Sequence, residues 1–230
     1  MRAGEPRGRA RVSPRATAGA SSSRANGVIV MDQANGHVST EVIDEGGRRR
    51  LRVDLAGEIF SLPFKLIAGR EVGFLDISGQ FRLIERAADL LVDRLRARDV
   101  AFDTVLNPVS KSNALAHAIA VRWAAAHPGL ERTVVARKSD DPRNPARTTY
   151  RSVTTTHDQT LSITPDDAAF LDGKRILLVD DVFGGGGTTR ALRSLADQTH
   201  AVVVAHAVVA VEQGADVPPD LTYLFELPVL

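Results

Sequence analysis

Residues 174–195 read KRILLVDDVFGGGGTTRALRSL and carry the strongest structural signal in the chain. Its apolar first half is typical of a buried strand, and that strand ends in two acids, Asp180 and Asp181. Four glycines follow as a turn, and the two threonines after them begin a predicted helix over residues 188–197. A strand that passes through a glycine-rich turn into a helix is an α/β pattern, in which ligands bind beyond the carboxyl ends of the strands.

The glycine turn, residues 184–187, has the features of an anion site. The N-terminus of a helix presents unpaired N–H groups, and glycine lets those backbone amides approach a phosphate closely. Four consecutive glycines are costly in backbone entropy unless something must come this near. The acid pair, Asp180 and Asp181, would repel a phosphate, so it suits sugar hydroxyls or a Mg²⁺ ion shared with the ligand.

Other interpretations of this stretch exist. The Walker P-loop of a nucleotide triphosphatase requires a lysine after the last glycine, and none follows Gly187. A receiver domain also has paired aspartates after an apolar strand, but near its start and without four glycines. The simplest interpretation is a pair of capping aspartates before a flexible turn.

Strands and helices alternate along the rest of the chain. The patterns predict a hairpin at residues 51–62, helices at residues 81–98 and 114–126, strands at residues 104–106, 133–136, 175–179 and 201–211, and a strand pair between Tyr150 and Ile163. The central strands lack polar alternation and are separated by helices. We therefore expect an α/β fold whose central, mostly parallel sheet is buried on both faces.

The composition fits one soluble domain. The chain has 230 residues, 43% of them hydrophobic, and a formal net charge of +1, so no global field favours nucleic acid or a membrane. The lack of cysteine excludes disulfides and thiolate chemistry and fits a reducing cytoplasm. No apolar stretch approaches the roughly 20 residues of a membrane span.

The first forty residues are predicted to be a disordered basic tail, and residues 41–230 to be one domain. Residues 1–30 are rich in Arg, Ala, Ser and Gly, contain Glu5 as their only acid, and lack apolar periodicity. Three origins remain open: a translation start at Met31, a solvated basic tail, or an organelle transit peptide. This segment cannot form a helix-turn-helix.

The sequence VDDVFGGGGT at residues 179–188 resembles the 5-phosphoribosyl-1-pyrophosphate (PRPP) motif of type I phosphoribosyltransferases, especially the adenine and xanthine enzymes. Four weaker likenesses occur in the family's order: residues 73–77 to the hood segment over the base, 107–116 to the pyrophosphate loop, 135–138 to the Arg-Lys pair before the lid, and 152–163 to the segment after it. The resemblance implies a type I phosphoribosyltransferase fold, with a central mostly parallel sheet flanked by helices, a small hood at about residues 41–80 and a flexible lid at residues 139–150.

The resemblance also implies roles for single residues. The acid pair would hold the ribose hydroxyls of PRPP and, through PRPP, Mg²⁺. The other implied site residues are Gly184, Gly185, Gly186, Gly187 and Thr188 for the 5-phosphate; Ser110, Lys111 and Ser112 for pyrophosphate; Arg137 and Lys138 for the departing pyrophosphate; and Phe74 and Asp76 for the base. For Lys111 and Phe74, a surface charge and a core residue are the competing interpretations. The family often carries a non-proline cis peptide in its pyrophosphate loop.

The implied protein is a cytoplasmic, Mg²⁺-dependent enzyme, expected as a homodimer with no nucleic-acid or membrane partner. It would transfer the phosphoribosyl group of PRPP to a purine-like base, giving a nucleoside 5′-monophosphate and pyrophosphate. Glu212 and Gln213, just past the last predicted strand, fall where family members carry base-contacting residues.

Some positions depart from the family pattern. Gly184 and Gly185 replace the usual Ser or Thr and so remove side-chain donors to phosphate. Ser112 stands at a usual glycine, and Val109 stands where adenine and xanthine enzymes usually have an acid. The acid that hypoxanthine-guanine enzymes place at the Gly184 position is also missing. These changes leave two alternatives open: a non-catalytic PRPP-sensing regulator, or an enzyme of secondary metabolism that uses a modified base.

Overall fold

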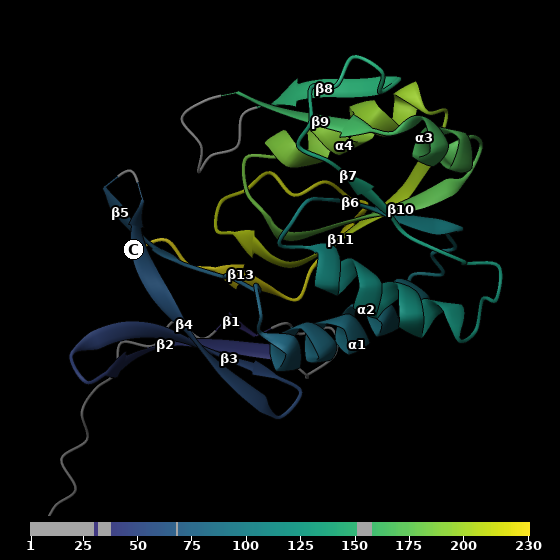
Figure 1. The fold of residues 1–230 in the computed structure, drawn as a ribbon. Coiled ribbons are helices and arrows are strands. Elements are labelled where there is room, and N and C mark those ends of the chain that lie inside the picture. Colours follow the sequence, from purple (N-terminus) through teal and green to yellow (C-terminus); the bar gives the residue numbers. More distant parts are fainter. Residues whose placement is uncertain (1–29, 32–37, 68, 151–157) are drawn as a thin grey trace, which may run out of the picture.

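The computed structural model describes residues 30–31, 38–67, 69–150 and 158–230 (Figure 1). Its strands are β1 (Val30–Met31), β2 (Val38–Glu45), β3 (Arg48–Leu55), β4 (Glu58–Ile67), β5 (Arg70–Gly73), β6 (Thr104–Pro108), β7 (Val134–Ala136), β8 (Ala146–Tyr150), β9 (Gln159–Ile163), β10 (Arg175–Phe183), β11 (Val202–Glu212), β12 (Leu221–Thr222) and β13 (Phe225–Leu227). Its helices are α1 (Phe81–Ala97), α2 (Asn113–Ala124), α3 (Pro165–Leu171) and α4 (Gly187–Gln198). The predicted tail lies mostly outside the described residues, although β1 and the start of β2 fall within residues 1–40.

Strand β10 lies in the middle of a parallel sheet. The strand order is β12–β11–β10–β6–β7, β13 also pairs with β11, and all of these described pairings are parallel. Residues 176–179 of β10 are completely buried. The expected parallel sheet, buried on both faces, is therefore confirmed.

Helices cover both faces of the sheet that contains β10 (Figure 1). Leu177 and Val179 belong to the cluster that also contains the buried sides of α1 and α2. Ile176 and Leu178 belong to the cluster formed with α3, α4 and β9. This three-layer arrangement places the carboxyl ends of the parallel strands at one common edge, where ligands bind in such sheets.

Helix α1 carries the helical periodicity that the sequence predicted. Its buried side includes Ile84, Ala87 and Leu91, which recur every three or four residues. Past its end, Arg98 donates a hydrogen bond to the Leu221 carbonyl at 2.9 Å, which ties the helix to β12. The predicted helix at residues 81–98 is confirmed, with an end one residue earlier.

The hood is a separate antiparallel sheet of order β1–β2–β3–β4–β5, which lies beside α1 in Figure 1. Strands β3 and β4 form the predicted hairpin. They turn at Ala56 and Gly57, whose φ angles of 51° and 90° suit a two-residue hairpin loop. Arg86 of α1 donates hydrogen bonds to the Leu55 and Ala56 carbonyls at 3.0 and 2.6 Å, which fixes this hairpin to the body.

The segment predicted as a lid differs from expectation in its second half. There, β8 pairs antiparallel with β9, so the strand pair predicted beyond Tyr150 begins before it. Ala146 is completely buried, and the Arg147 amide donates to the Gln198 side chain of α4 at 3.0 Å. The threonines and tyrosine of β8 favour a strand once one face is covered. The family-like residues 152–154 lie outside the described residues.

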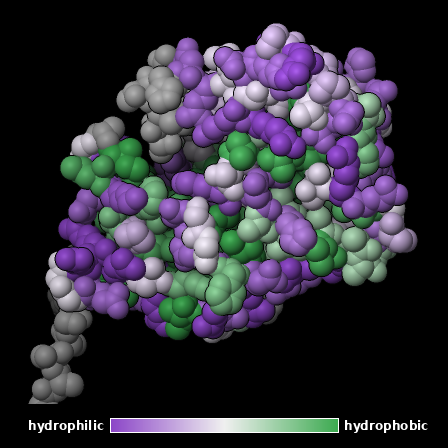
Figure 2. All heavy atoms as spheres, viewed as in Figure 1, coloured by the Kyte–Doolittle hydropathy of each residue, from purple (hydrophilic) through white to green (hydrophobic). Residues whose placement is uncertain are grey.

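The visible face in Figure 2 is largely hydrophilic, with an apolar group at the tip of the hood, where Leu66 is 75% exposed. Within the described part of the chain, no helix is both long and apolar enough to cross a membrane.

Candidate active site

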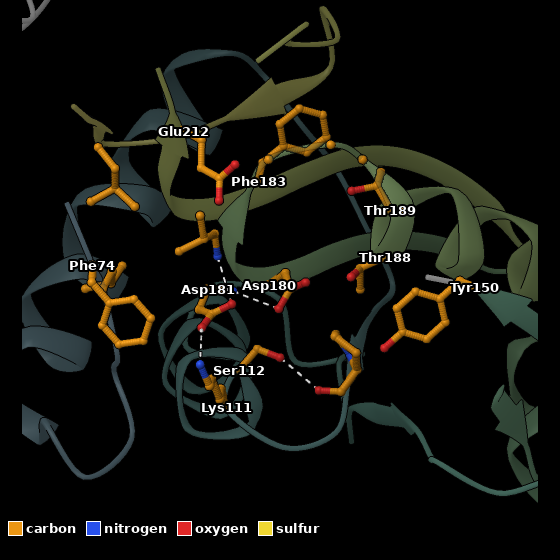
Figure 3. Close-up of a pocket in the computed structure, with 18 of the residues that line it drawn as sticks. Phe74, Lys111, Ser112, Tyr150, Asp180, Asp181, Phe183, Thr188, Thr189 and Glu212 are labelled. Carbon is orange, nitrogen blue, oxygen red and sulfur yellow. Dashed lines mark hydrogen bonds and ion pairs between the residues drawn. The ribbon is translucent and has the colours of Figure 1, made fainter. Parts of the chain in front are cut away.

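A cavity of about 290 Å³ lies at the carboxyl end of β10 (Figure 3). Its wall combines the hood near Phe74, the loop at residues 108–112, the acid pair, the glycine turn with the start of α4, and Glu212 at the end of β11. All predicted site residues line it except Arg137, Asp76 and Gln213. The fold therefore brings together segments that lie more than a hundred residues apart in the sequence.

The acid pair occupies the last part of β10, where side chains turn from the core into the cavity. The Asp180 carboxylate accepts the Asp181 amide, and the Asp181 carboxylate accepts the Val182 amide, both at 2.9 Å. Burial raises the pKa of Asp180 well above its ordinary value, and the adjacent Asp181 charge raises it further. Burial also raises the pKa of Asp181, while the Lys111 ammonium, 4.0 Å from its carboxylate, opposes the shift.

These two carboxylates fit a magnesium ion only as partial ligands. The described residues contain no group of three or more His, Cys, Asp or Glu side chains that could hold a metal. Mg²⁺ commonly binds through one or two carboxylates together with oxygens of its phosphate ligand, rather than in an all-protein cage. The acid pair thus suits a Mg²⁺ ion that arrives with a phosphorylated sugar.

The glycine turn joins the acid pair to α4 and leaves the start of this helix open. Gly186 occupies the N-cap position with φ 70°, a left-handed conformation that glycine adopts without strain. No side chain caps the helix, and its first turn contains no acid. Free amides and the positive end of the helix dipole therefore face the cavity beside Thr188. This is an arrangement that binds phosphate.

The loop at residues 108–112 faces the acid pair across the cavity. Its Val109–Ser110 peptide bond is cis, as the resemblance implied. The Ser112 hydroxyl is buried and donates to the Pro108 carbonyl at 2.9 Å, so its side chain is occupied within the loop. Lys111 is exposed and reaches toward the acid pair and Phe74, with its ammonium 5.6 Å from the Phe74 ring. The loop therefore offers backbone amides and one exposed cation.

Phe74 extends from the hood into the cavity, opposite the end of β10 (Figure 3). It is half-buried and is not among the residues of the hydrophobic core, so the competing core interpretation is not supported. The Lys65 ammonium lies 3.4 Å from its ring centroid. Asp76 lies outside the cavity wall. Its carboxylate accepts the Ser78 amide at 3.1 Å, and hydrogen bonds from the side chain and backbone of Ser78 lower the pKa of Asp76.

The Arg-Lys pair divides between two environments. Lys138 lines the cavity, whereas the Arg137 backbone pairs with Ser162 through two hydrogen bonds of 2.9 Å and its side chain is outside the wall. Sequence reasoning missed Tyr150 and Gln159, which also line the cavity and share a 3.0 Å hydrogen bond. Burial and the nearby Asp180 charge raise the pKa of Tyr150.

The likeness to known proteins is one of structure. No protein-family model matches the sequence, and no match to a curated protein was found. The fold matches adenine phosphoribosyltransferase from Thermoanaerobacter pseudethanolicus with a TM-score of 0.53 at 20% identity, covering 65% of this chain and 84% of that one. The enzyme from Rhodothermus marinus matches with a TM-score of 0.51 at 18% identity, covering 81% and 93%.

A third match is the adenine phosphoribosyltransferase from Trypanosoma brucei, solved with AMP, pyrophosphate and ribose-5-phosphate. Its TM-score is 0.50 at 19% identity, and the match covers 65% of this chain and 67% of that one. Together with the parallel sheet, the hood and the acid pair before a glycine turn, these matches define the fold. The chain has the type I phosphoribosyltransferase fold, in the form found in adenine phosphoribosyltransferases.

Proposed function

We propose that this protein is a purine-type phosphoribosyltransferase, which transfers the phosphoribosyl group of PRPP to a nitrogenous base. The products are a nucleoside 5′-monophosphate and pyrophosphate. The observation that carries the proposal is the acid pair and the uncapped glycine turn on one wall of a cavity, with an aromatic ring on the other. Hydroxyl acceptors, a phosphate site and a stacking surface are what a phosphoribosyl group and a base require.

Each part of the wall then has a task. The glycine turn and Thr188 hold the 5-phosphate through backbone amides and a hydroxyl, and the acid pair accepts the ribose hydroxyls. Mg²⁺ held by these acids and the PRPP oxygens would neutralise charge on the leaving pyrophosphate. Lys111 and Lys138 stabilise the same group, and Phe74 stacks on the base. The protein contributes positioning, electrostatic stabilisation and exclusion of water around a reacting carbon that gains positive charge.

A binding-only function is the second candidate, and one observation favours it. The turn has no hydroxyl at Gly184 or Gly185, so fewer groups reach the phosphate than the family pattern provides. The added hydroxyl of Ser112 does not replace them, because it donates to the Pro108 carbonyl. A protein that senses PRPP needs affinity but no turnover. The homodimer implied by the resemblance stays a prediction, which light scattering coupled to gel filtration tests.

The decisive experiment measures turnover and binding separately. The protein is incubated with PRPP, Mg²⁺ and a panel of bases, and pyrophosphate release is assayed; PRPP affinity is measured by calorimetry. Release with at least one base supports the enzyme, and binding without release supports the sensor. An Asp181→Asn variant should lose PRPP affinity, whereas Asp93→Asn, on the exposed face of α1, should behave as wild type. Unchanged PRPP affinity in Asp181→Asn contradicts both the enzyme and the PRPP sensor.

A further inference from the structure

The glycine turn lies between two cavities. The cavity described above, viewed in Figure 3, contains the acid pair and Thr188 in its wall. A second cavity, of about 410 Å³, lies between the start of α4 and residues 212–216 at the end of β11. Residues 184–186 line both cavities, whereas Arg190 of α4 lines only the second. Arg190 is therefore placed to act on the turn from behind, without contact with a ligand in the first cavity.

Arg190 bonds to the glycine turn through both its backbone and its side chain. Its amide donates to the Gly186 carbonyl at 2.9 Å, and its Nη1 donates to the Gly185 carbonyl at 3.1 Å. Within the described part of the chain, no other side chain hydrogen-bonds to the backbone of residues 184–187. A Cβ atom on Gly186 would lie 3.0 Å from the same Nη1 and 3.6 Å from Phe183 Cζ, so the guanidinium packs against the turn. Because glycines have no side chains with which to hold a conformation, these contacts restrict the turn.

The bond from Arg190 to the Gly185 carbonyl also fixes the direction of the next amide. In a trans peptide, the C=O of one residue and the N–H of the next point in opposite directions, and the cis bond found in the described residues is elsewhere, at Val109–Ser110. Since the Gly185 carbonyl faces Arg190, the Gly186 N–H is directed to the opposite side, that of the first cavity. A peptide between two glycines flips easily, and a flipped peptide would turn its carbonyl oxygen toward a phosphate and repel it.

We propose that Arg190 is a positioning residue for the phosphate subsite, which holds the Gly185–Gly186 peptide with its N–H toward the bound 5-phosphate. The inference rests on the proposed function and concerns the place where this chain lacks hydroxyls, at Gly184 and Gly185. An amide that is held in the binding direction offsets part of that loss. The guanidinium bond also polarises the peptide, and a polarised peptide is a stronger N–H donor.

The test uses two ligands that would occupy different parts of the site. Ribose 5-phosphate would bind the glycine turn, whereas pyrophosphate with Mg²⁺ would bind the loop at residues 108–112. In Arg190→Ala we expect the affinity for ribose 5-phosphate to fall about five- to tenfold, the effect of one hydrogen bond, and that for pyrophosphate to stay within about threefold. Arg190→Lys keeps a cationic donor and should bind ribose 5-phosphate about threefold more tightly than Arg190→Ala. Calorimetric titration measures all of these affinities.

Arg193→Ala is the matched control. It removes a cation from the same helix, and that cation pairs with Asp220 instead of the turn. If Arg190 acts through the Gly185 carbonyl, and not through the general positive charge of α4, then Arg193→Ala should bind ribose 5-phosphate as wild type does.

The outcomes separate this inference from the proposed function. If wild type does not bind ribose 5-phosphate, the proposed function fails. If wild type binds it and Arg190→Ala binds it equally well, only the role of Arg190 is overturned. Equal losses for both ligands in Arg190→Ala would mean that the effect extends beyond the turn, and this also overturns the inference. An equal loss of ribose 5-phosphate affinity in Arg193→Ala, or an Arg190→Lys variant that binds no better than Arg190→Ala, overturns it as well.

Discussion

Gly184 and Glu212 share one volume, so a side chain at residue 184 would require the Glu212 carboxylate to move. A methyl group at Gly184 would meet the Glu212 carboxylate at 2.4 Å, well inside contact distance. We predict that Gly184→Ala displaces either the carboxylate or the turn and lowers ribose 5-phosphate affinity about tenfold or more. Calorimetric titration measures the effect.

A control and a rescue define the cause. Gly129→Ala makes the same substitution where no atom lies within 4 Å of the added methyl, and should leave affinity unchanged. Combining Gly184→Ala with Glu212→Ala frees the volume, so the double variant should recover most of the ribose 5-phosphate affinity. Contacting residues commonly couple by about 0.5–3 kcal/mol in such cycles. Additive losses would show that the two side chains do not compete.

We expect the acid pair to destabilise the fold at neutral pH, although the proposed binding of ribose hydroxyls requires it. Folding raises the pKa of Asp180, so the folded chain holds this proton more tightly than the unfolded chain does. Stability contributed by this group is therefore present at low pH and is lost as pH rises from the ordinary value near 3.8 through the raised value. At neutral pH the buried charge destabilises the fold.

We therefore predict that Asp180→Asn increases the free energy of unfolding at pH 7 by roughly 1–2 kcal/mol while it abolishes turnover. For a chain of this length, each kcal/mol raises Tm by about 2–4 °C. The gain should disappear near pH 4, where the wild-type carboxyl is protonated as well. Thermal melts of both proteins at pH 4 and pH 7 test this. A variant less stable at pH 7, or a pH-independent difference, contradicts the prediction.

Among the elements, the hood depends on α1 for its position. Arg86 donates to two carbonyls of the β3–β4 hairpin, those of Leu55 and Ala56. Arg86→Ala leaves the Leu55 and Ala56 carbonyls without these donors, and we predict a loss of about 1–2 kcal/mol in urea unfolding. Because Phe74 follows β5 of the hood, the base should also bind less tightly.

Arg82, one helical turn earlier on α1, is the matched control. Its side chain is 71% exposed and forms one ion pair with Glu58 of the same hood sheet at 3.2 Å. Exposed pairs contribute little, so Arg82→Ala should change stability by less than about 0.5 kcal/mol. Equal losses in both variants would indicate a general effect of removing charge from α1, and not the carbonyl bonds of Arg86.

Elements with a strong local signal could be predicted from the sequence. Helix α1 and strand β10 carry their periodicity or apolar run in consecutive residues, and both were predicted to within a few residues. Helix α3 was missed because it is seven residues long and rests on a local cap, in which the Thr164 hydroxyl accepts the Asp167 amide at 3.3 Å. Pairing between β8 and β9 depends on their packing against α4, which no local pattern encodes.

The same distinction holds for the candidate site. The acid pair and glycine turn are contiguous, so their common location was predicted from one motif. Tyr150 and Gln159 enter the cavity wall because β8 and β9 pair in the register Tyr150↔Gln159, which the sequence does not reveal. The contact between Gly184 and Glu212 follows from a register too, since Phe183 pairs with Val211 one position before them. The pairing of strands therefore determines which residues outside the acid pair and glycine turn line the cavity.

For the whole molecule, ligand binding should be visible as global stabilisation, because a ligand that binds only the folded chain shifts the unfolding equilibrium. At a ligand concentration one hundred times Kd, the gain is about 2.7 kcal/mol. We predict that PRPP with Mg²⁺ raises Tm by several degrees, that the shift saturates with concentration, and that it shrinks when EDTA removes Mg²⁺. Differential scanning fluorimetry across a PRPP titration measures it.

Asp181→Asn tests whether this Tm shift comes from PRPP bound at the acid pair. Asp181→Asn keeps the size of the side chain but lowers its capacity to accept ribose hydroxyls and to bind Mg²⁺, so the saturating shift should require about tenfold more PRPP or more. Asp93→Asn, 73% exposed on α1, should shift as wild type does. Since the cavity joins the hood, the central sheet and α4, ligand in it should stabilise them as one cooperative unit. A shift of equal size in Asp181→Asn would mean that PRPP stabilises the chain from a different place.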